Sequence, residues 1–270
     1  MKLKIPYRQI LVFIPIIFFL FTCRNALLKT VSTPIPPLDG PIPILPTNSP
    51  PPDTPISQSS LTRELAEYEF PDSIDPTKQY LFYLHGKIIE DQGIPATSPD
   101  YGEYECKAIL EKLAEYNFVV VSEQRPKSTD GAEYAKKIAE QITTLLNAGV
   151  PAENISVVGA SKGAGITILV SHLLANEEIN IVIMAICHPD IVDDFTQNQI
   201  FLFGNVLSIY DSTDDLAGSC QELFSFSTGK GIARHDEIVL NIGTGHGILY
   251  KPLDEWILPV VQWANNDPDW

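Results

Sequence analysis

The sequence predicts an α/β protein with a mostly parallel sheet of about six strands and helices on both faces. From residue 78 onward, apolar runs of strand length alternate with segments whose apolar residues recur at helical spacing. The strand-like runs are continuously apolar, as in strands buried on both faces of a sheet. The chain has 270 residues, 44% of them hydrophobic, which suffices for one large core. Alternation of this kind predicts a parallel sheet, and we expect no internal repeat and no inserted cap domain.

The predicted strands are short apolar runs, at residues 79–86, 118–124, 155–159, 179–188, 206–210 and 237–242. The predicted helices lie between and after them, at residues 104–116, 130–149, 162–178, 221–227 and 252–264. The helix at 130–149 has the clearest ends, because Asp130 can cap its first turn and Gly149 can stop it.

In open parallel sheets, functional groups gather where the carboxyl ends of strands meet the following loops. The stretch VVGASKGAG at 157–165 lies at such a place, with a predicted strand before it and a predicted helix after it. Its G-x-S-x-G pattern predicts that Ser161 is a nucleophile on a sharp turn. Gly159 and Gly163 would relieve the crowding of that turn. A hydroxyl in an ordinary glycine-rich connection is the alternative.

A serine nucleophile needs a base, an acid that orients the base, and N–H donors for the oxyanion. The loop after the strand at 206–210 offers Asp211, Asp214 and Asp215. We favour Asp214, which lies far enough along the loop to curl back toward a histidine, and keep the other two as alternatives. His246, between two glycines after the last predicted strand, is the candidate base.

This order of groups resembles the α/β-hydrolase family over roughly residues 76–265. The resemblance rests on G-A-S-K-G at 159–163, S-I-Y-D-S-T-D-D at 208–215, G-H-G at 245–247 and His85-Gly86 after the first strand. In that family the chain order is nucleophile, acid, histidine. The resemblance therefore implies a triad of Ser161, Asp214 and His246.

The resemblance also implies an oxyanion hole made of two backbone N–H groups, those of Lys162 and Lys87. The sequence has H-G-K-I at 85–88, where many lipases and esterases of the family have HGGG. His85, Gly86 and Arg125 are candidate substrate-binding residues at the same edge of the sheet, and residues 87–105 are expected to form one wall of the site.

The resemblance implies a serine hydrolase that cleaves an ester, thioester or amide bond of a small-molecule acyl substrate, with no cofactor and no metal. Arg125 and the side chains of Lys87 and Lys162 would place three positive charges near the site. This suggests the hypothesis that the substrate carries a negative charge or a polarised acyl group. The alternative is that these side chains face solvent and that only the backbone amides of the two lysines take part, as donors to the oxyanion. An acyltransferase on the same triad and a non-catalytic binding module remain alternative functions, because a fold does not determine function.

The N-terminal residues predict export. Residues 1–23 combine a basic start with a short apolar run, as in a signal peptide. They end in L-F-T-C, which resembles a bacterial lipobox with Cys23 as the lipidated residue; a plain secretory signal and an uncleaved anchor are the alternatives. Residues 24–60 are rich in proline and predict an extended tether, followed by the α/β domain at 61–270. We expect a membrane-anchored lipoprotein or a periplasmic or secreted protein.

The charge and the cysteines argue against two other classes of function. The net charge of −16 disfavours binding to the phosphate backbone of nucleic acids. The four cysteines show no spacing typical of a metal site. Besides Cys23, we expect Cys106, Cys187 and Cys220 to be buried free thiols, with one disulfide among the three as the alternative.

Overall fold

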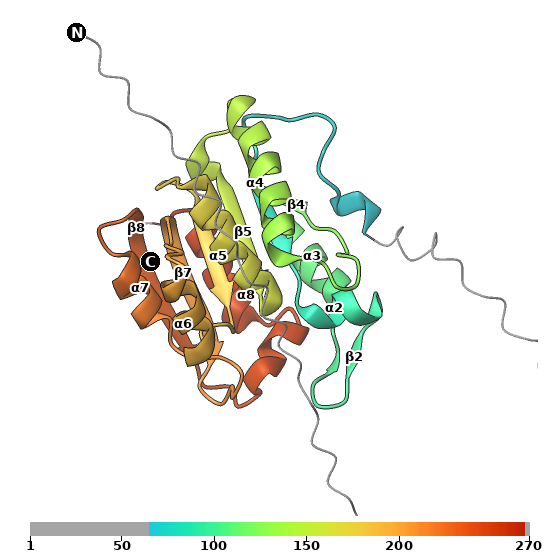
Figure 1. Ribbon diagram of the computed structural model, residues 1–270. Coiled ribbons are helices and arrows are strands. Elements are labelled where there is room, and N and C mark those ends of the chain that lie inside the picture. Colours follow the sequence, from blue (N-terminus) through green and yellow to red (C-terminus); the bar gives the residue numbers. More distant parts are fainter. Residues whose placement is uncertain (1–64, 268–270) are drawn as a thin grey trace, which may run out of the picture. The chain divides into compact units, whose positions relative to one another are not determined.

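A six-stranded parallel sheet lies at the centre of residues 65–267, the part of the chain that the computed structural model describes (Figure 1). Its strand order is β4-β1-β5-β6-β7-β8. The strands are β1 (Gln79–Leu84), β4 (Phe118–Val121), β5 (Ile155–Ala160), β6 (Asn180–Met184), β7 (Gly204–Asp211) and β8 (Ile232–Leu240). The predicted α/β class and parallel sheet are confirmed.

Helices cover both faces of this sheet. They are α2 (Lys87–Gln92), α3 (Cys106–Ala114), α4 (Gly131–Asn147), α5 (Lys162–Leu174), α6 (Pro189–Gln197), α7 (Gln221–Ser227) and α8 (Asp254–Ala264). Short 3-10 helices are η1 (Ala66–Tyr68), η2 (Ala152–Asn154) and η3 (Gly245–Tyr250), and β2 (Thr97–Ser98) pairs with β3 (Gly102–Glu103) as an antiparallel hairpin. One apolar core packs α4, α5, α6 and α7 on one face, and a second packs α3 and α8 on the other (Figure 1).

The central strands β1, β5 and β6 are almost wholly buried because both of their faces are covered. In β1, Leu81 and Tyr83 belong to the core beneath α3 and α8, whereas Phe82 and Leu84 belong to the core beneath α4 and α5. Successive side chains of a strand point to opposite faces, so each core takes every second residue. Only α6 lies between β6 and β7, so no cap domain is inserted there, as expected.

Helix α4 has the ends that the sequence predicts. The Asp130 carboxylate accepts hydrogen bonds from the amides of Ala132 and Glu133, at 2.9 and 3.0 Å, and so caps the first turn. Gly149 follows the last turn with a φ of +90°, a conformation that glycine adopts without strain.

Several elements differ from the sequence prediction. The expected loop at 87–105 contains α2 and the β2–β3 hairpin, and helix α6 was not predicted. Strand β8 begins at Ile232, five residues before the predicted start, since an edge strand with alternating exposed residues lacks a continuous apolar run. Helix α5 ends at Leu174 instead of residue 178, because Ala175 adopts a left-handed conformation.

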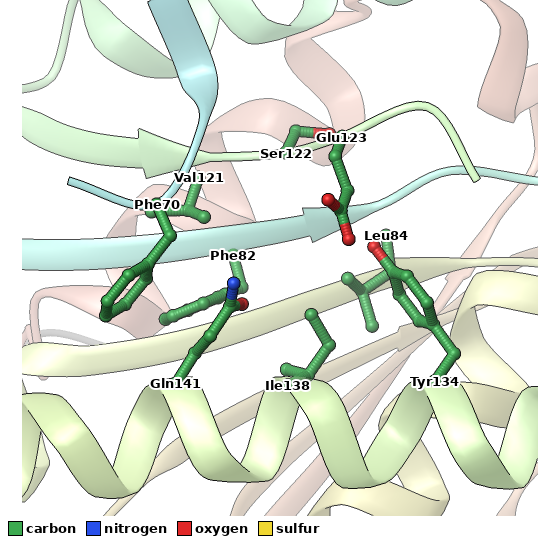
Figure 2. Close-up of a pocket in the computed structure, with 9 residues that line it drawn as sticks. All are labelled: Phe70, Phe82, Leu84, Val121, Ser122, Glu123, Tyr134, Ile138 and Gln141. Atoms are coloured by element: carbon green, nitrogen blue, oxygen red, sulfur yellow. The ribbon is translucent and has the colours of Figure 1, made fainter. Parts of the chain in front are cut away.

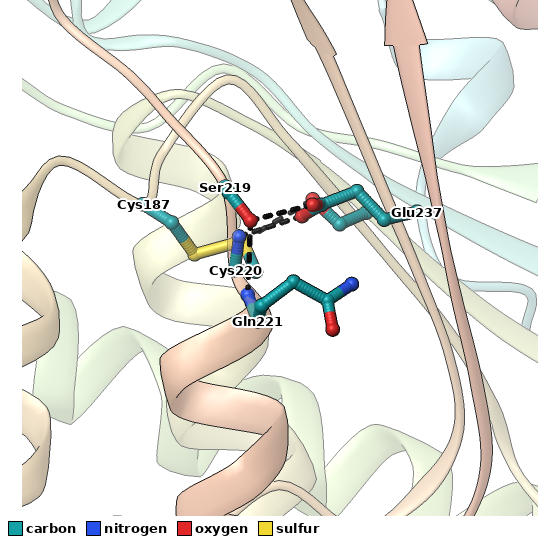
Figure 3. The surroundings of a disulfide bond; sticks show 6 residues. Cys187, Ser219, Cys220, Gln221 and Glu237 are labelled. Carbon is teal, nitrogen blue, oxygen red and sulfur yellow. Dashed lines mark hydrogen bonds between the residues drawn. A yellow bond between two sulfur atoms is a disulfide. The ribbon is translucent and has the colours of Figure 1, made fainter.

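The expectation of three free thiols is wrong for two of them. Cys187 and Cys220 form a disulfide with a Cα–Cα distance of 5.2 Å, whereas Cys106 is free and buried (Figure 3). The two bonded cysteines follow β6 and β7, which are neighbours in the sheet, so their loops meet at its carboxyl edge.

The predicted signal peptide at 1–23, the candidate lipidation site Cys23 and the tether at 24–60 lie outside the described residues. Between residues 65 and 267, none of the helices is both long enough and apolar enough to span a membrane.

Candidate active site

Ser161 occupies the turn between β5 and α5 in a strained backbone conformation, with φ 52° and ψ −117°. Such a conformation costs free energy for a residue with a side chain, and strain of this kind is concentrated at functional sites. The turn is held on both sides. The Ser161 amide donates to the carbonyl of Met184 at 2.9 Å, and the Ser161 carbonyl accepts from Ala164 at 2.8 Å. A side chain at such a turn stands out from the sheet edge.

Two glycines make this turn sterically feasible. A Cβ atom at Gly163 would lie 1.8 Å from the carbonyl oxygen of Leu84, and one at Gly159 would lie 2.4 Å from that of Gly163. Both contacts are with backbone atoms that cannot turn away. The expectation that these glycines relieve crowding is therefore confirmed, and helix α5 packs closely against β1 and β5 because of them.

The turn after β1 lies beside Ser161. Strands β1 and β5 are neighbours, with Leu84 paired to Gly159. A methyl group at Gly86 would stand 3.8 Å from the Cβ atom of Ser161. Lys87 and Lys162 are the first residues of α2 and α5, and amides in the first turn of a helix have no partner within that helix. The two amides predicted as oxyanion donors thus begin the helices that follow β1 and β5, two strands whose ends are neighbours.

Asp214 and His246 form a hydrogen bond, with 2.8 Å between Oδ2 and Nδ1. The Asp214 side chain is fully buried and that of His246 is 11% exposed. The other carboxylate oxygen of Asp214 accepts from the amide of Leu216 at 2.9 Å, which fixes the orientation of the group. Since an ionised carboxylate only accepts hydrogen bonds, Nδ1 of His246 carries the proton and Nε2 is left as the basic nitrogen.

The other two candidate acids have different surroundings. Asp211 accepts hydrogen bonds from Thr213 on one oxygen and from the amides of Ile242 and Gly243 on the other, at 2.9 and 3.1 Å. Burial alone would raise the pKa of Asp211, but these hydrogen bonds outweigh it and lower the pKa. Asp211 therefore ties the loop of Asp214 to the loop of His246, whereas Asp215 is exposed.

The segment between α2 and α3 lies next to His246, as the sequence analysis expects of one wall of the site. The Tyr101 ring is 6.3 Å from the His246 ring and 5.2 Å from the Tyr250 ring, between centroids. Burial, with a contribution from the Asp214 carboxylate, raises the pKa of Tyr101. Sequence reasoning missed Tyr101, since nothing in its local pattern distinguishes it from the other tyrosines.

Two candidate substrate-binding side chains are buried instead of open to a ligand. The Arg125 side chain is fully buried and paired with Glu90, with 3.3 Å between Nε and Oε2. The His85 ring is also buried; its Nε2 accepts from the Arg125 amide at 3.0 Å, and its Nδ1 lies 2.8 Å from the Gly86 carbonyl. The expectation that Arg125 and His85 face a substrate is wrong, because both are bound within the protein.

The charges of the two lysines are likewise engaged. Lys162 Nζ donates to Glu90 at 2.6 Å and to the Thr129 carbonyl at 2.8 Å. Lys87 forms an exposed ion pair with Asp91 in the next turn of α2. The hypothesis of three cations facing a negatively charged substrate therefore loses its basis. Glu90, which joins Arg125 and Lys162, lies in a segment that the sequence predicts as a loop and was missed.

Two hollows in the described part of the chain lie apart from the proposed triad. One, of about 10 Å³, has room for about one water molecule and is lined by residues of α4, β1 and the end of β4, including Phe82, Tyr134 and Gln141 (Figure 2). The other, of about 380 Å³, lies at the start of α3 beside Tyr104 and Cys106. Within residues 65–267, no group of three or more His, Cys, Asp or Glu side chains is placed to hold a metal ion.

No protein-family model and no curated protein sequence matches this chain. Among solved structures it is similar to SOBER1 of Arabidopsis thaliana, with 13% identity over 70% of this chain and 99% of that chain and a TM-score of 0.48. It is also similar to a predicted CIB-like hydrolase of Thermoplasma acidophilum, with 17% identity over 72% and 89% and a TM-score of 0.47. A phospholipase/carboxylesterase of Dyadobacter fermentans shows 19% identity over 70% and 89%, with a TM-score of 0.45.

Identities this low are no guide to activity. The assignment of fold rests on the strand order and on the position of Ser161, at a strand-to-helix turn on the carboxyl edge of a six-stranded parallel sheet. That arrangement is α/β-hydrolase-like.

Proposed function

We propose that this protein is a serine hydrolase that cleaves an ester or related acyl bond of a small-molecule substrate. The observation that carries the proposal is the hydrogen bond between Asp214 and His246, in loops at the same edge of the sheet as the strained turn of Ser161. An acid that orients a histidine, downstream of a serine on a sharp turn, is the arrangement that nucleophilic acyl transfer requires.

In the proposed mechanism, Ser161 Oγ attacks the carbonyl carbon of the substrate while Nε2 of His246 accepts the hydroxyl proton. Asp214 holds the proton on Nδ1 and stabilises the imidazolium that forms. The amides of Lys162 and Lys87 donate to the oxyanion of the tetrahedral intermediate. The intermediate collapses to an acyl-enzyme as His246 returns the proton to the leaving group. Water then attacks the acyl carbon as His246 accepts its proton, and His246 returns that proton to Ser161 Oγ as the bond to the acyl group breaks and the acid leaves.

Labelling with a fluorophosphonate tests this mechanism directly, because the reagent phosphonylates an activated serine. Wild-type protein is expected to label, and the Ser161→Ala variant is expected not to. A folded wild type that stays unlabelled and leaves p-nitrophenyl acetate intact would point instead to a non-catalytic binding module. If an acyl acceptor such as an alcohol outcompetes water in product analysis, the activity is that of an acyltransferase on the same triad.

We also propose that the domain is exported, either anchored by lipid on Cys23 or released after cleavage of residues 1–23. The Cys187–Cys220 disulfide supports export, since disulfides persist in oxidising compartments. Incorporation of labelled palmitate that is lost in a Cys23→Ala variant would support the lipid anchor. Incorporation that persists in that variant would contradict it.

A further inference from the structure

A cluster of buried charges lies between the two turns that begin helices α2 and α5. Its members are Glu90 on α2, Arg125 in the segment after β4, and Lys162 at the start of α5. The side chains of Glu90 and Arg125 are fully buried, and that of Lys162 is 26% exposed. Charges buried this deeply are costly unless they are paired and hydrogen-bonded, so the arrangement calls for an explanation beyond packing.

The Glu90 carboxylate joins three segments of the chain. Its Oε2 accepts from Nε of Arg125 at 3.3 Å. Its Oε1 accepts from Lys162 Nζ at 2.6 Å and from the Thr129 amide at 3.0 Å. Lys162 Nζ donates in addition to the Thr129 carbonyl at 2.8 Å. One carboxylate therefore connects helix α2 to the start of helix α5 and to the segment that follows β4.

Arg125 extends these connections to the turn after β1. Its guanidinium donates to the His85 carbonyl, and its backbone amide donates to Nε2 of the His85 ring at 3.0 Å. Nδ1 of the same ring lies 2.8 Å from the Gly86 carbonyl. Burial and the charge of Arg125 lower the pKa of His85 to about 3, so the ring is neutral and donates from Nδ1 while it accepts at Nε2.

We propose that Glu90, Arg125 and Lys162 are positioning residues that hold the amides of Lys87 and Lys162 at the spacing an oxyanion requires. The inference rests on the proposed function, since it assigns a role within the same site. The amides belong to different helices, and the Glu90 carboxylate of α2 joins these helices through its hydrogen bond with Lys162 of α5. Oxyanion donors must be held within about 0.5 Å of the productive geometry, which demands such support.

The proposal has a kinetic signature. The two amides bind the charge that develops in the transition state, so displacement of one of them lowers kcat and leaves KM nearly unchanged. A group misplaced by about 1 Å can cost about 100-fold in rate. If the Lys162 ammonium instead bound the substrate, its removal would raise KM for carboxylate-bearing esters and spare kcat.

The test compares Lys162→Met with Lys162→Arg, Glu90→Gln and the control Lys136→Met. Lys136 forms a similar lysine–glutamate pair with Glu133, but on the exposed face of α4. Each full-length variant is assayed on p-nitrophenyl acetate and on the p-nitrophenyl monoester of succinate, after thermal melts establish that it is folded. We expect Lys162→Met to lower kcat about 10- to 100-fold on both esters, with KM changed less than about 3-fold. Lys162→Arg, which can still donate to Glu90 and Thr129, should recover most of this loss.

Glu90→Gln keeps the shape of the side chain and removes its charge, and we expect at least as large a loss of kcat. If that variant fails to fold, the lysine pair decides the outcome, because the Lys162 side chain is the exposed member of the cluster. The inference is overturned if Lys162→Met has the wild-type kcat, or if its only defect is a higher KM for the succinate ester. The proposed function is tested separately, and it stands if the wild type turns over ester and is labelled by the fluorophosphonate. A folded wild type that neither hydrolyses ester nor reacts with the fluorophosphonate overturns the proposed function, and this inference with it.

Discussion

The two halves of the proposed site are held together by different means. The nucleophile half, at the ends of β1 and β5, relies on backbone close-packing at Gly159 and Gly163 and on the buried cluster around Glu90. The acid–histidine half, at the ends of β7 and β8, relies on ties between loops. Asp211 bonds to the amides of Ile242 and Gly243, and the Thr213 hydroxyl accepts from Gly245 at 3.2 Å.

The disulfide and Glu237 hold the far end of the loop at 212–220, which contains Asp214. Cys220, at the start of α7, is bonded to Cys187, and its amide donates to the Glu237 carboxylate of β8 at 2.6 Å (Figure 3). The Ser219 hydroxyl donates to the other oxygen of the same carboxylate, also at 2.6 Å. The difference between the halves follows from the connections: β5 passes into α5 through a tight turn, whereas β7 and β8 end in longer loops that crosslinks hold in place. The halves should therefore respond differently to substitution.

The largest effect is expected in the acid–histidine half and on catalysis alone. Asp214→Asn keeps an oxygen for the Leu216 amide but presents an NH2 group to Nδ1 of His246, which favours the wrong tautomer. We expect kcat to fall about 10⁴-fold at nearly unchanged stability, measured by ester hydrolysis and urea unfolding.

Two neighbouring carboxylates serve as controls for Asp214. Asp215→Asn changes an exposed group and should leave kcat unaltered. Asp211→Asn should lower the stability by about 1–3 kcal/mol, since it disturbs buried hydrogen bonds to the histidine loop, with a smaller loss of kcat than Asp214→Asn. A larger loss of kcat in Asp211→Asn than in Asp214→Asn would identify Asp211 as the catalytic acid instead.

The next effect is expected in the nucleophile half and on stability. Gly163→Ala would place a methyl group 1.8 Å from the Leu84 carbonyl oxygen, so the backbone of α5 or β1 must move. We expect a loss of about 4 kcal/mol or more in the free energy of unfolding. Gly165→Ala, two residues further along the same helix, is the matched control. Its methyl group would lie 3.8 Å from the Ile186 side chain, and we expect no loss of stability. Equal melting temperatures for the two variants would show that Gly163 is not needed for the close packing of α5 against β1.

A somewhat smaller effect is expected from the disulfide. It joins cysteines separated by 33 residues, and a crosslink of that span stabilises a fold by about 3–4 kcal/mol. Urea unfolding of the wild type should therefore shift to lower urea when reductant is present. A Cys187→Ser/Cys220→Ser double variant should unfold at the lower concentration with or without reductant. A wild type that is insensitive to reductant, with free thiols detected after reduction, would show that the bond contributes nothing.

The smallest effect concerns pH and the nucleophile half. The pKa of His85 is lowered from 6.5 to about 3, mainly by burial. Between these values the unfolded chain binds a proton at His85 that the folded chain does not, so stability falls as the pH falls below about 6.5. One proton is worth about 1.4 kcal/mol per pH unit, which gives about 2 kcal/mol between pH 6.5 and 5. His85→Gln cannot titrate, and its stability should depend less on pH over this interval. If the free energies of unfolding of the wild type and of His85→Gln depend on pH in the same way, the lowered pKa of His85 is contradicted.

Local patterns in the sequence were sufficient for the class of fold and for most of its elements. Strands β1, β4, β5 and β6 are apolar on both faces, so a window of a few residues identifies them. The edge strand β8 was placed five residues too late, because its exposed side chains interrupt the apolar run. Helix α6 was missed although its pattern is amphipathic, with Val192 and Phe195 buried and Asp190, Asp193 and Asp194 exposed.

What the sequence determined by itself is the strained turn of Ser161 and the order of serine, aspartate and histidine along the chain. Gly159 makes room for Gly163, four residues further along the chain, so the local motif contains that part of the steric reason for the turn. Gly163 makes room for the Leu84 carbonyl of β1, a contact that exists only once the sheet has formed. Tertiary structure alone decided which aspartate meets His246, that Cys187 pairs with Cys220, and that Arg125 and His85 face inward to a buried network. Each of these outcomes depends on side chains from strands far apart in the chain that become neighbours only when the sheet forms.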